Sequence, residues 1–203
     1  PLPGPRDTDQ VNLTDEESRI MPVSGGGFDQ CYNAQASVDT DTMLVVRSHM
    51  TQATNDKQEI APALTKLSAL PEALGTVTDL LADTGYFSAA NVKACIEGDI
   101  QPSLAVTRDQ HHLSVFDRFA PDDPAPITED PVVLMKHQLT TEAGRALYAL
   151  RKQTVEPVFG IIKHVMGLRQ FSMRGLDKVT GEWTLAPLAW NVKRLNVLRM
   201  APS

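Results

Sequence analysis

The sequence predicts an α/β domain in which a mixed sheet is flanked by helices. Between residues 32 and 108, short stretches that alternate apolar and polar residues are followed by stretches with helical periodicity. This succession is typical of an α/β layer sandwich. With 203 residues, 42% of them apolar, the chain can bury one sizeable core.

The first 31 residues differ from the rest in composition. They contain four prolines and the triplet Gly25–Gly27, with almost no apolar periodicity. We expect residues 1–31 to form a poorly ordered leader and residues 32–203 to form the domain. Since the first residue is Pro1 and not Met, we expect the chain to begin inside a longer reading frame or to have been trimmed.

Two strands joined by a short turn open the domain. Residues 32–38 alternate apolar and polar side chains, and the β-branched stretch 43–50 follows the turn-like residues 39–41. The short connection predicts an antiparallel hairpin. Asn55 or Asp56 can then cap a helix that runs to about Leu70.

An acidic residue follows the next apolar run. Residues 77–82 are expected to form a strand that is buried on both faces, with Asp83 at its carboxyl end and Ser88 capping a helix over 89–97. Open α/β sheets place ligand and metal chemistry at this point, although an isolated Asp there is more often a turn or cap residue.

A further strand is expected at 102–108, followed by an inserted, structureless loop at 109–139 that is acidic and rich in proline. His111, His112 and His137 lie in it, and we interpret them as surface residues because no Cys or acidic partner stands at a ligand spacing.

The stretch Tyr148–Lys163 places one carboxylate among cations on a helix that starts near Glu142. At about 100° per residue, Lys152, Glu156 and Lys163 fall within roughly 40° of one another around the helix axis. Pro157 is expected to kink or restart this helix. The face is either a functional site or a solvated stripe of charges.

The last helix is expected over about 183–199. Its apolar residues repeat at helical spacing and predict a core-facing stripe, and the two tryptophans, Trp183 and Trp190, are expected to pack in the core. The stripe consists of Leu185, Leu188, Ala189, Val192 and Leu195.

Charge and composition narrow the class of protein. Residues 148–203 hold nine Lys and Arg and three acids, whereas the whole chain has a net charge of −6. A basic end on an acidic body suggests one surface that meets phosphate, or basic residues that merely cover two helices. There is no spanning apolar run, no export signal and no pattern of paired cysteines or zinc ligands, so we expect a cytoplasmic protein.

The segment around Glu156 resembles the Tyr–Arg–Glu–Lys signature of insertion-sequence transposases with a DDE catalytic centre. Tyr148 and Arg151 are separated by two residues, and Glu156 and Lys163 by six, as in that signature. Arg151 lies one residue too far from Glu156, whereas Lys152 is at the expected distance, so either can fill the basic position. The resemblance continues upstream in GGGFDQCYNAQASVD and LLADTGYFS and downstream in RGLDKVTGEW.

The resemblance implies an RNase H-like fold, with Asp83 as the second catalytic aspartate and Glu156 as the catalytic glutamate. Both would bind Mg²⁺ or Mn²⁺, because hard cations prefer oxygen ligands and this chemistry uses two cations about 3.5–4 Å apart. Tyr148, Arg151, Lys152 and Lys163 would contact double-stranded DNA at transposon ends or target. A homo-oligomer is implied in the active complex, and the protein would be associated with the nucleoid.

No apolar strand precedes Tyr32, so the central first strand and the first catalytic aspartate of that fold are expected to be missing. The chain would then be the C-terminal part of a transposase catalytic domain, weakly active or inactive in metal-dependent DNA cleavage and transfer. One alternative is a non-catalytic DNA-binding or regulatory remnant of an insertion element. Another is an ordinary α/β domain that binds a small anionic ligand.

Overall fold

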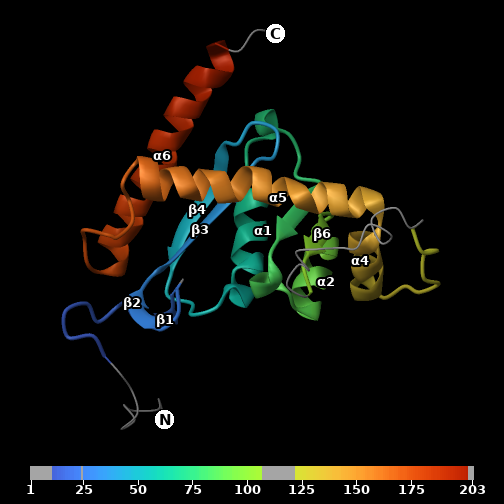
Figure 1. Ribbon diagram of the computed structural model, residues 1–203, viewed down its shortest axis with the longest axis horizontal. Helices are drawn as coiled ribbons and strands as arrows, with labels where there is room; N and C mark the ends of the chain where they lie inside the picture. The colour runs from blue at the N-terminus through green and yellow to red at the C-terminus, as the bar shows by residue number, and fades with distance from the viewer. Residues whose placement is uncertain (1–10, 24, 107–121, 201–203) are drawn as a thin grey trace.

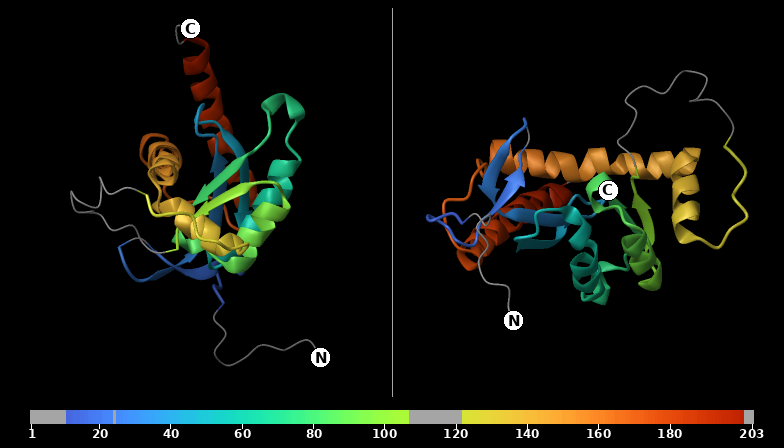
Figure 2. Two further views of the ribbon diagram at one scale, coloured as in Figure 1. Left: turned by 90° about the vertical axis from the view of Figure 1, so that its right-hand side faces the viewer. Right: turned by 90° about the horizontal axis from the view of Figure 1, so that it is seen from below.

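The computed structural model describes residues 11–23, 25–106 and 122–200. Its strands form three two-stranded sheets, flanked by helices, so the expectation of a mixed α/β fold is confirmed at that level. Figure 2 shows α5 on one side of the strands and α1 and α2 on the other. The histidines at 111 and 112, residues 1–10 and the end of the expected strand at 102–108 lie outside the described residues.

Part of the expected leader is a hairpin. β1 (Arg19–Pro22) pairs antiparallel with β2 (Phe28–Cys31). All three residues of Gly25–Gly27 have φ near +90°, a conformation that glycine adopts without steric cost, and they close the turn. The glycine triplet is therefore a turn signal and not a sign of disorder over the whole segment.

The predicted hairpin at the start of the domain is confirmed. β3 (Asn33–Val38) pairs antiparallel with β4 (Val45–Thr51). Asn55 caps the 3₁₀ turn η1 (Asp56–Gln58), and α1 (Ile60–Ser68) follows. A second 3₁₀ turn, η2 (Glu72–Leu74), leads to the next strand.

The next unit is a parallel β–α–β crossover. β5 (Asp79–Ala82) leads through the 3₁₀ turn η3 (Thr84–Tyr86) into α2 (Ala89–Glu97), which Ser88 caps as predicted, and β6 (Gln101–Leu104) pairs parallel with β5. Only Ala82 of β5 is buried, so the expectation of a strand buried on both faces is wrong.

Three helices complete the chain. The insertion contains α4 (Pro131–Thr140), which Asp130 caps, so this part is not the structureless loop that we expected. α5 (Glu142–Gly160) continues through Pro157 without restarting, and a π-helical turn, η4 (Ile161–Val165), follows it. α6 (Leu176–Met200) begins seven residues before the predicted start at 183.

The core consists of two clusters of buried side chains. One lies between β3–β4, α5, η4 and α6, where Trp183 stacks on Phe159 at a centroid distance of 5.7 Å. The other lies between α1, β5, α2, β6 and α4. Trp183 and Trp190 are buried and donate their indole N–H groups to the carbonyls of Gln35 and Met43, so their packing role is confirmed.

The apolar stripe of α6 lies on the opposite side from the one we predicted. Its large members are exposed, whereas Val179, Trp183, Ala186 and Trp190 form the buried face. Helical spacing identifies an apolar stripe but not the direction in which the helix turns it. The two indoles, which bury more surface and have hydrogen-bond acceptors on the hairpin, decide that direction.

Candidate functional site

A cavity of about 600 Å³ lies between the edges of β3 and β5. Residues 34–39 and 78–83 line it from the strands, while α1 and α5 add further residues. Asp83, Arg151 and Glu156 all line this cavity. The tertiary structure therefore brings together the two acids that lie 73 positions apart in the sequence.

Asp83 follows β5 directly and caps the next 3₁₀ turn. Its Oδ1 accepts a hydrogen bond of 2.9 Å from the backbone N–H of Gly85. A Cβ at Gly85 would lie 3.1 Å from Asp83 Oδ1 and 3.1 Å from Asp56 Oδ2. Glycine is therefore the residue that lets two carboxylates approach this turn, and Asp56 is a neighbour that the sequence did not single out.

Glu156 lies on α5, and its side chain is 53% exposed. The carboxylate forms an ion pair of 3.4 Å with Arg151, whose guanidinium lies 5.5 Å from the centre of the Tyr148 ring. Such a half-exposed ion pair contributes little to stability. Glu156 therefore remains able to exchange this partner for another cation.

A second cavity, of about 1010 Å³, contains the last residue of the signature. Lys163, Arg169 and Arg174 line it, with Asp15 and Asp56 among the other lining residues. Lys163 Nζ lies 5.8 Å from the Phe159 ring centre. Among the described residues, no carboxylate lies within 4.0 Å of these three cations. With Asp29, the cavity is lined by three carboxylates and three cations, so an anion would bind at the three cations and away from the acids.

The structure divides the charged face that the helical spacing predicted. Glu156 lines the first cavity and Lys163 the second, and Lys152 is exposed and lines neither. For Lys163 the reason is η4, because a π-helical turn has i→i+5 hydrogen bonds and departs from the 100° rotation per residue. Lys152 and Glu156 both precede this turn on α5. Arg151, by contrast, lies beside Glu156 in the first cavity.

A buried hydrogen-bond network holds Asp56 beside the Asp83 turn. Gln35, only 4% exposed, donates to Asp56 Oδ1 at 2.8 Å and accepts from the Tyr86 hydroxyl at 2.6 Å. Asn33 donates to the same Asp56 oxygen at 2.8 Å. Burial, then the charge of Asp56, raises the pKa of Tyr86, which keeps its hydroxyl a donor. No local sequence pattern predicts this network.

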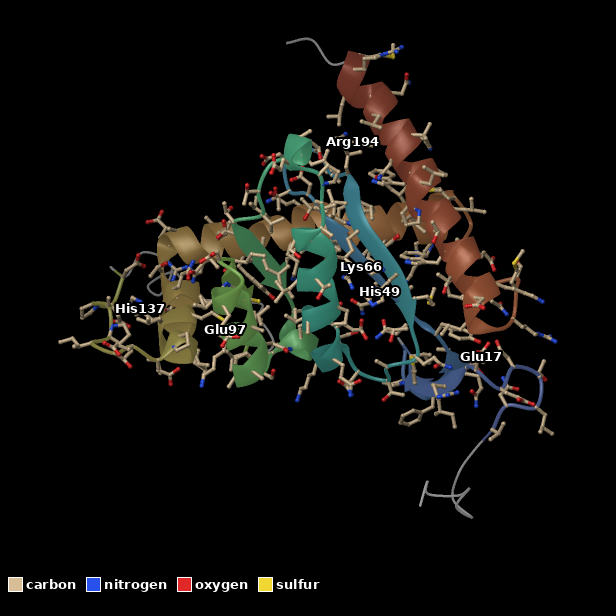
Figure 3. The ribbon with its side chains drawn as sticks, turned by 180° about the vertical axis from the view of Figure 1, so that it is seen from behind. Glu17, His49, Lys66, Glu97, His137 and Arg194 are labelled. Carbon is tan, nitrogen blue, oxygen red and sulfur yellow. The ribbon has the colours of Figure 1, made fainter. Side chains whose placement is uncertain are left out.

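A second buried polar group joins β4 to α1. His49 Nε2 lies 2.6 Å from Glu59 Oε2, and Arg47 contacts the other side of the imidazole. Arg47 and Glu59 are buried, and Figure 3 labels His49 between the strand and the helix. Burial and the neighbouring Arg47 lower the pKa of His49, and together they outweigh the opposing effect of Glu59.

Among the described residues, no three His, Cys, Asp or Glu side chains are grouped closely enough to bind a metal ion. The imidazole of His137 instead contacts the backbone: its Nε2 lies 2.9 Å from the carbonyl oxygen of Asp123. In the described segments, no helix is both long and apolar enough to cross a membrane.

Fold and site together define an α/β protein with a carboxylate-lined cavity next to one that is lined by both cations and carboxylates. Residues 126–196 match the family model described as transposase DDE domain. This match confirms the resemblance noted from the sequence: over this segment the chain is similar to the DDE domain of transposases. Glu156 lies within the matched segment and Asp83 lies outside it. No curated protein and no solved structure matches the chain.

Proposed function

We propose that this chain is part of a DDE transposase catalytic domain that binds DNA and takes part in its metal-dependent cleavage and transfer. One observation carries the proposal: Glu156, inside the segment that matches the DDE domain, lines the same cavity as Asp83. Two carboxylates that face one cavity are the start of a metal-assisted phosphodiester site. Asp83 and Glu156 are the catalytic residues in this proposal.

The same two carboxylates are the proposed ligands of Mg²⁺ or Mn²⁺. Their oxygen donors fit hard divalent cations, and the half-exposed Glu156 can leave its ion pair with Arg151 to bind one. When bound, the cations activate an attacking hydroxyl and stabilise a leaving oxygen. The fit is partial, because two carboxylates supply fewer ligands than a pair of such cations needs.

We further propose that the cavity between β3 and β5 is the position of an additional strand in an RNase H-like sheet. Among the described residues, both bordering strands have a neighbour on one edge only, and residues of both strands line the cavity. Residues of α1 and α5 also line the cavity, so helices border it as they border the strands. Such a strand would supply the third carboxylate, and without it we expect the chain to be weakly active or inactive.

DNA is the proposed partner of the cations on and after α5. Arg151, Lys152 and Lys163, with Tyr148, are the residues that the signature implies, and Arg169 and Arg174 extend this set through the second cavity. Lys and Arg bind the phosphate backbone independently of base sequence. We propose double-stranded DNA as the substrate, bound by a complex of more than one copy.

The second candidate is a non-catalytic DNA-binding or regulatory remnant. The ion pair between Arg151 and Glu156 favours it, because the guanidinium occupies a carboxylate that catalysis would need. Nicking of supercoiled DNA in Mn²⁺ separates the two candidates. Weak nicking that disappears in Glu156→Gln supports the enzyme, whereas DNA binding without nicking at any Mn²⁺ concentration supports the remnant.

Metal binding is tested by electron paramagnetic resonance of added Mn²⁺. Asp83→Asn and Glu156→Gln are each expected to reduce the bound fraction, and Asp99→Asn, on a surface turn, serves as the control. Asn tolerates the positive φ of Asp99, so this control keeps the fold. Equal Mn²⁺ binding by all four proteins would refute the assignment of the two ligands.

DNA binding is tested by fluorescence anisotropy of a labelled duplex at several salt concentrations. Replacing Lys163, Arg169 and Arg174 together by Ala is expected to reduce the slope of log K against log [salt] by about 3, since each phosphate contact contributes about 0.9. Lys93→Ala, on the exposed face of α2, is the control and should change the slope little. An unchanged slope in the triple variant would refute the DNA contact.

A further inference from the structure

α6 has two apolar faces, and the described chain covers only one of them. Val179, Trp183, Ala186 and Trp190 pack in the core, against the β3–β4 hairpin and α5. The other face carries four exposed residues: Leu185 (65%), Leu188 (56%), Val192 (61%) and Leu195 (53%). At about 100° per residue, the centres of the two faces lie about 180° apart on the helix.

The spacing of the exposed face indicates what kind of surface it fits. Leu185, Leu188, Val192 and Leu195 stand at i, i+3, i+7 and i+10, which are successive a and d positions of a heptad. Side chains at these positions insert into holes formed by four residues of a facing helix. The face therefore fits another α-helix better than a flat surface or a strand.

The residues at the two ends of the stripe select the partner and its direction. Gly181 and Arg199 continue the same seam, and they lie on opposite sides of its centre. In an antiparallel pair of identical helices, Leu185 faces Leu195, Leu188 faces Val192 and Arg199 faces Gly181. A parallel pair would instead place the two Arg199 side chains against each other, which like charges disfavour.

Gly181 offers room and charge for that arginine. A Cβ at Gly181 would have no atom within 4 Å, so the space outside it is open. The neighbouring Glu182 is held in place by hydrogen bonds from the backbone N–H groups of Ser172 and Met173. Arg199 of a second copy would therefore cross the helix at its one glycine, beside a fixed carboxylate.

The shape of the molecule permits this pairing. Figure 1 shows the C-terminal half of α6 extending beyond the rest of the fold, so that a second α6 can lie along its outer side. Arg194, labelled in Figure 3, belongs to the inner side, where its Nε donates to the carbonyl of Thr42 at 2.7 Å. That arginine is therefore not in the proposed interface.

We propose that α6 is a self-association surface, through which two copies of this chain pair as antiparallel helices around a two-fold axis near residue 190. It specifies a contact for the multi-copy complex proposed above. Each exposed Leu or Val can bury on the order of 100 Å², so the two stripes bury about 800 Å² of apolar surface. This is below the roughly 1,200–2,000 Å² of stable specific interfaces and in the range of weak, transient ones, so we expect a reversible dimer with Kd on the order of 10–100 μM.

A cysteine next to the two-fold axis tests the direction and register of the pair. Ala189 is exposed and flanks the seam, and in the antiparallel register it faces Ala189 of the second copy. In a Cys31→Ser background, Ala189→Cys is expected to form a disulfide-linked dimer under mild oxidation. Lys193→Cys, exposed but about 120° from the seam, is the matched control and should cross-link at least ten times more slowly.

Sedimentation equilibrium tests the association without cross-linking. The unmodified chain is expected to dimerise reversibly, and Leu188→Glu to remain monomeric with an unchanged circular dichroism spectrum, since Leu188 is exposed in the monomer. A monomer at all concentrations up to about 500 μM, or equal cross-linking of both cysteine variants, would overturn the proposal and leave the face for a different partner. Neither measurement contains DNA or metal, so its failure leaves the proposed cleavage chemistry untouched.

Discussion

Replacing Gln35 by Leu should destabilise the fold at the turn that carries Asp83. The Gln35 side chain donates to Asp56 and Asn33 at 2.8 and 2.9 Å and accepts from the Tyr86 hydroxyl at 2.6 Å. Leucine is similar in size but makes none of these bonds. It leaves the Tyr86 hydroxyl unpaired and removes one of the two amide donors to the Asp56 carboxylate.

The expected loss follows from these contacts. A hydrogen bond to a charged group contributes about 1.5–3 kcal/mol, and a buried polar group left without a partner costs about 1–3 kcal/mol. We therefore expect Gln35→Leu to lower the free energy of unfolding by about 3 kcal/mol. With an m value of about 2 kcal/mol/M, the urea midpoint falls by about 1.5 M.

A double-mutant cycle with Tyr86→Phe makes the reasoning refutable. Tyr86→Phe alone should cost about 1–2 kcal/mol, because it leaves the Gln35 oxygen unpaired. In the double variant both partners of that bond are apolar, so no polar group of the pair is left unpaired. The losses of the two single variants, added together, should therefore exceed the loss of the double variant by about 1 kcal/mol. Additive losses, measured by urea unfolding, would mean that the two side chains do not share a bond of consequence.

Three further predictions concern packing, pH and thiol reactivity. Gly144→Ala should destabilise the protein by about 2–3 kcal/mol, because the new Cβ would lie 2.7 Å from the Gln138 carbonyl carbon of α4. Gly160 has open space around it, so Gly160→Ala should stabilise the protein by about 0.5–1 kcal/mol. The lowered pKa of His49 means that the unfolded chain binds more protons below pH 6.5, so stability should fall as the pH drops from 7.5 to 5.5, less so in His49→Gln. Burial raises the pKa of Cys95 to about 11, so at pH 8 a thiol reagent should modify the half-buried Cys31 well before Cys95.

Each of these has a clear contrary result. Equal urea midpoints for the two glycine variants would show that α4 can move away from α5. An identical pH dependence in the chain with and without His49 would exclude that residue as its source. Modification of Cys95 at the rate of Cys31 in the native protein would show that the core around α2 opens readily.

Local sequence signals predicted the elements that depend on neighbouring residues. The hairpin of β3 and β4 followed from alternation and a short turn. Ser88 caps α2 where it was expected, and Asn55 caps the 3₁₀ turn that directly precedes α1. A cap bonds to a backbone N–H two or three residues away, so its partner is fixed by the sequence. Such interactions can be predicted from the sequence without knowledge of the tertiary structure.

Sequence features whose effect depends on distant residues led to less accurate predictions. The Gly25–Gly27 triplet closes a hairpin instead of marking disorder, and the proline at 131 begins α4 at its first turn, a position that proline favours. Pro157 does not restart α5, and the residues that follow it, Val158 and Ile162, are packed in the first core cluster. Composition alone does not reveal such packing.

The sequence by itself determined the succession of strands and helices from β3 to β6, the cap at Ser88 and the resemblance to DDE transposases. Only the tertiary structure decided that Asp83 and Glu156 line one cavity, that η4 turns Lys163 into another, and that Trp183 and Trp190, not the leucine stripe, face the core. The physical reason is the same in each case. Periodicity fixes which side chains share a face of an element, whereas the direction of that face depends on the surface that the whole fold can bury.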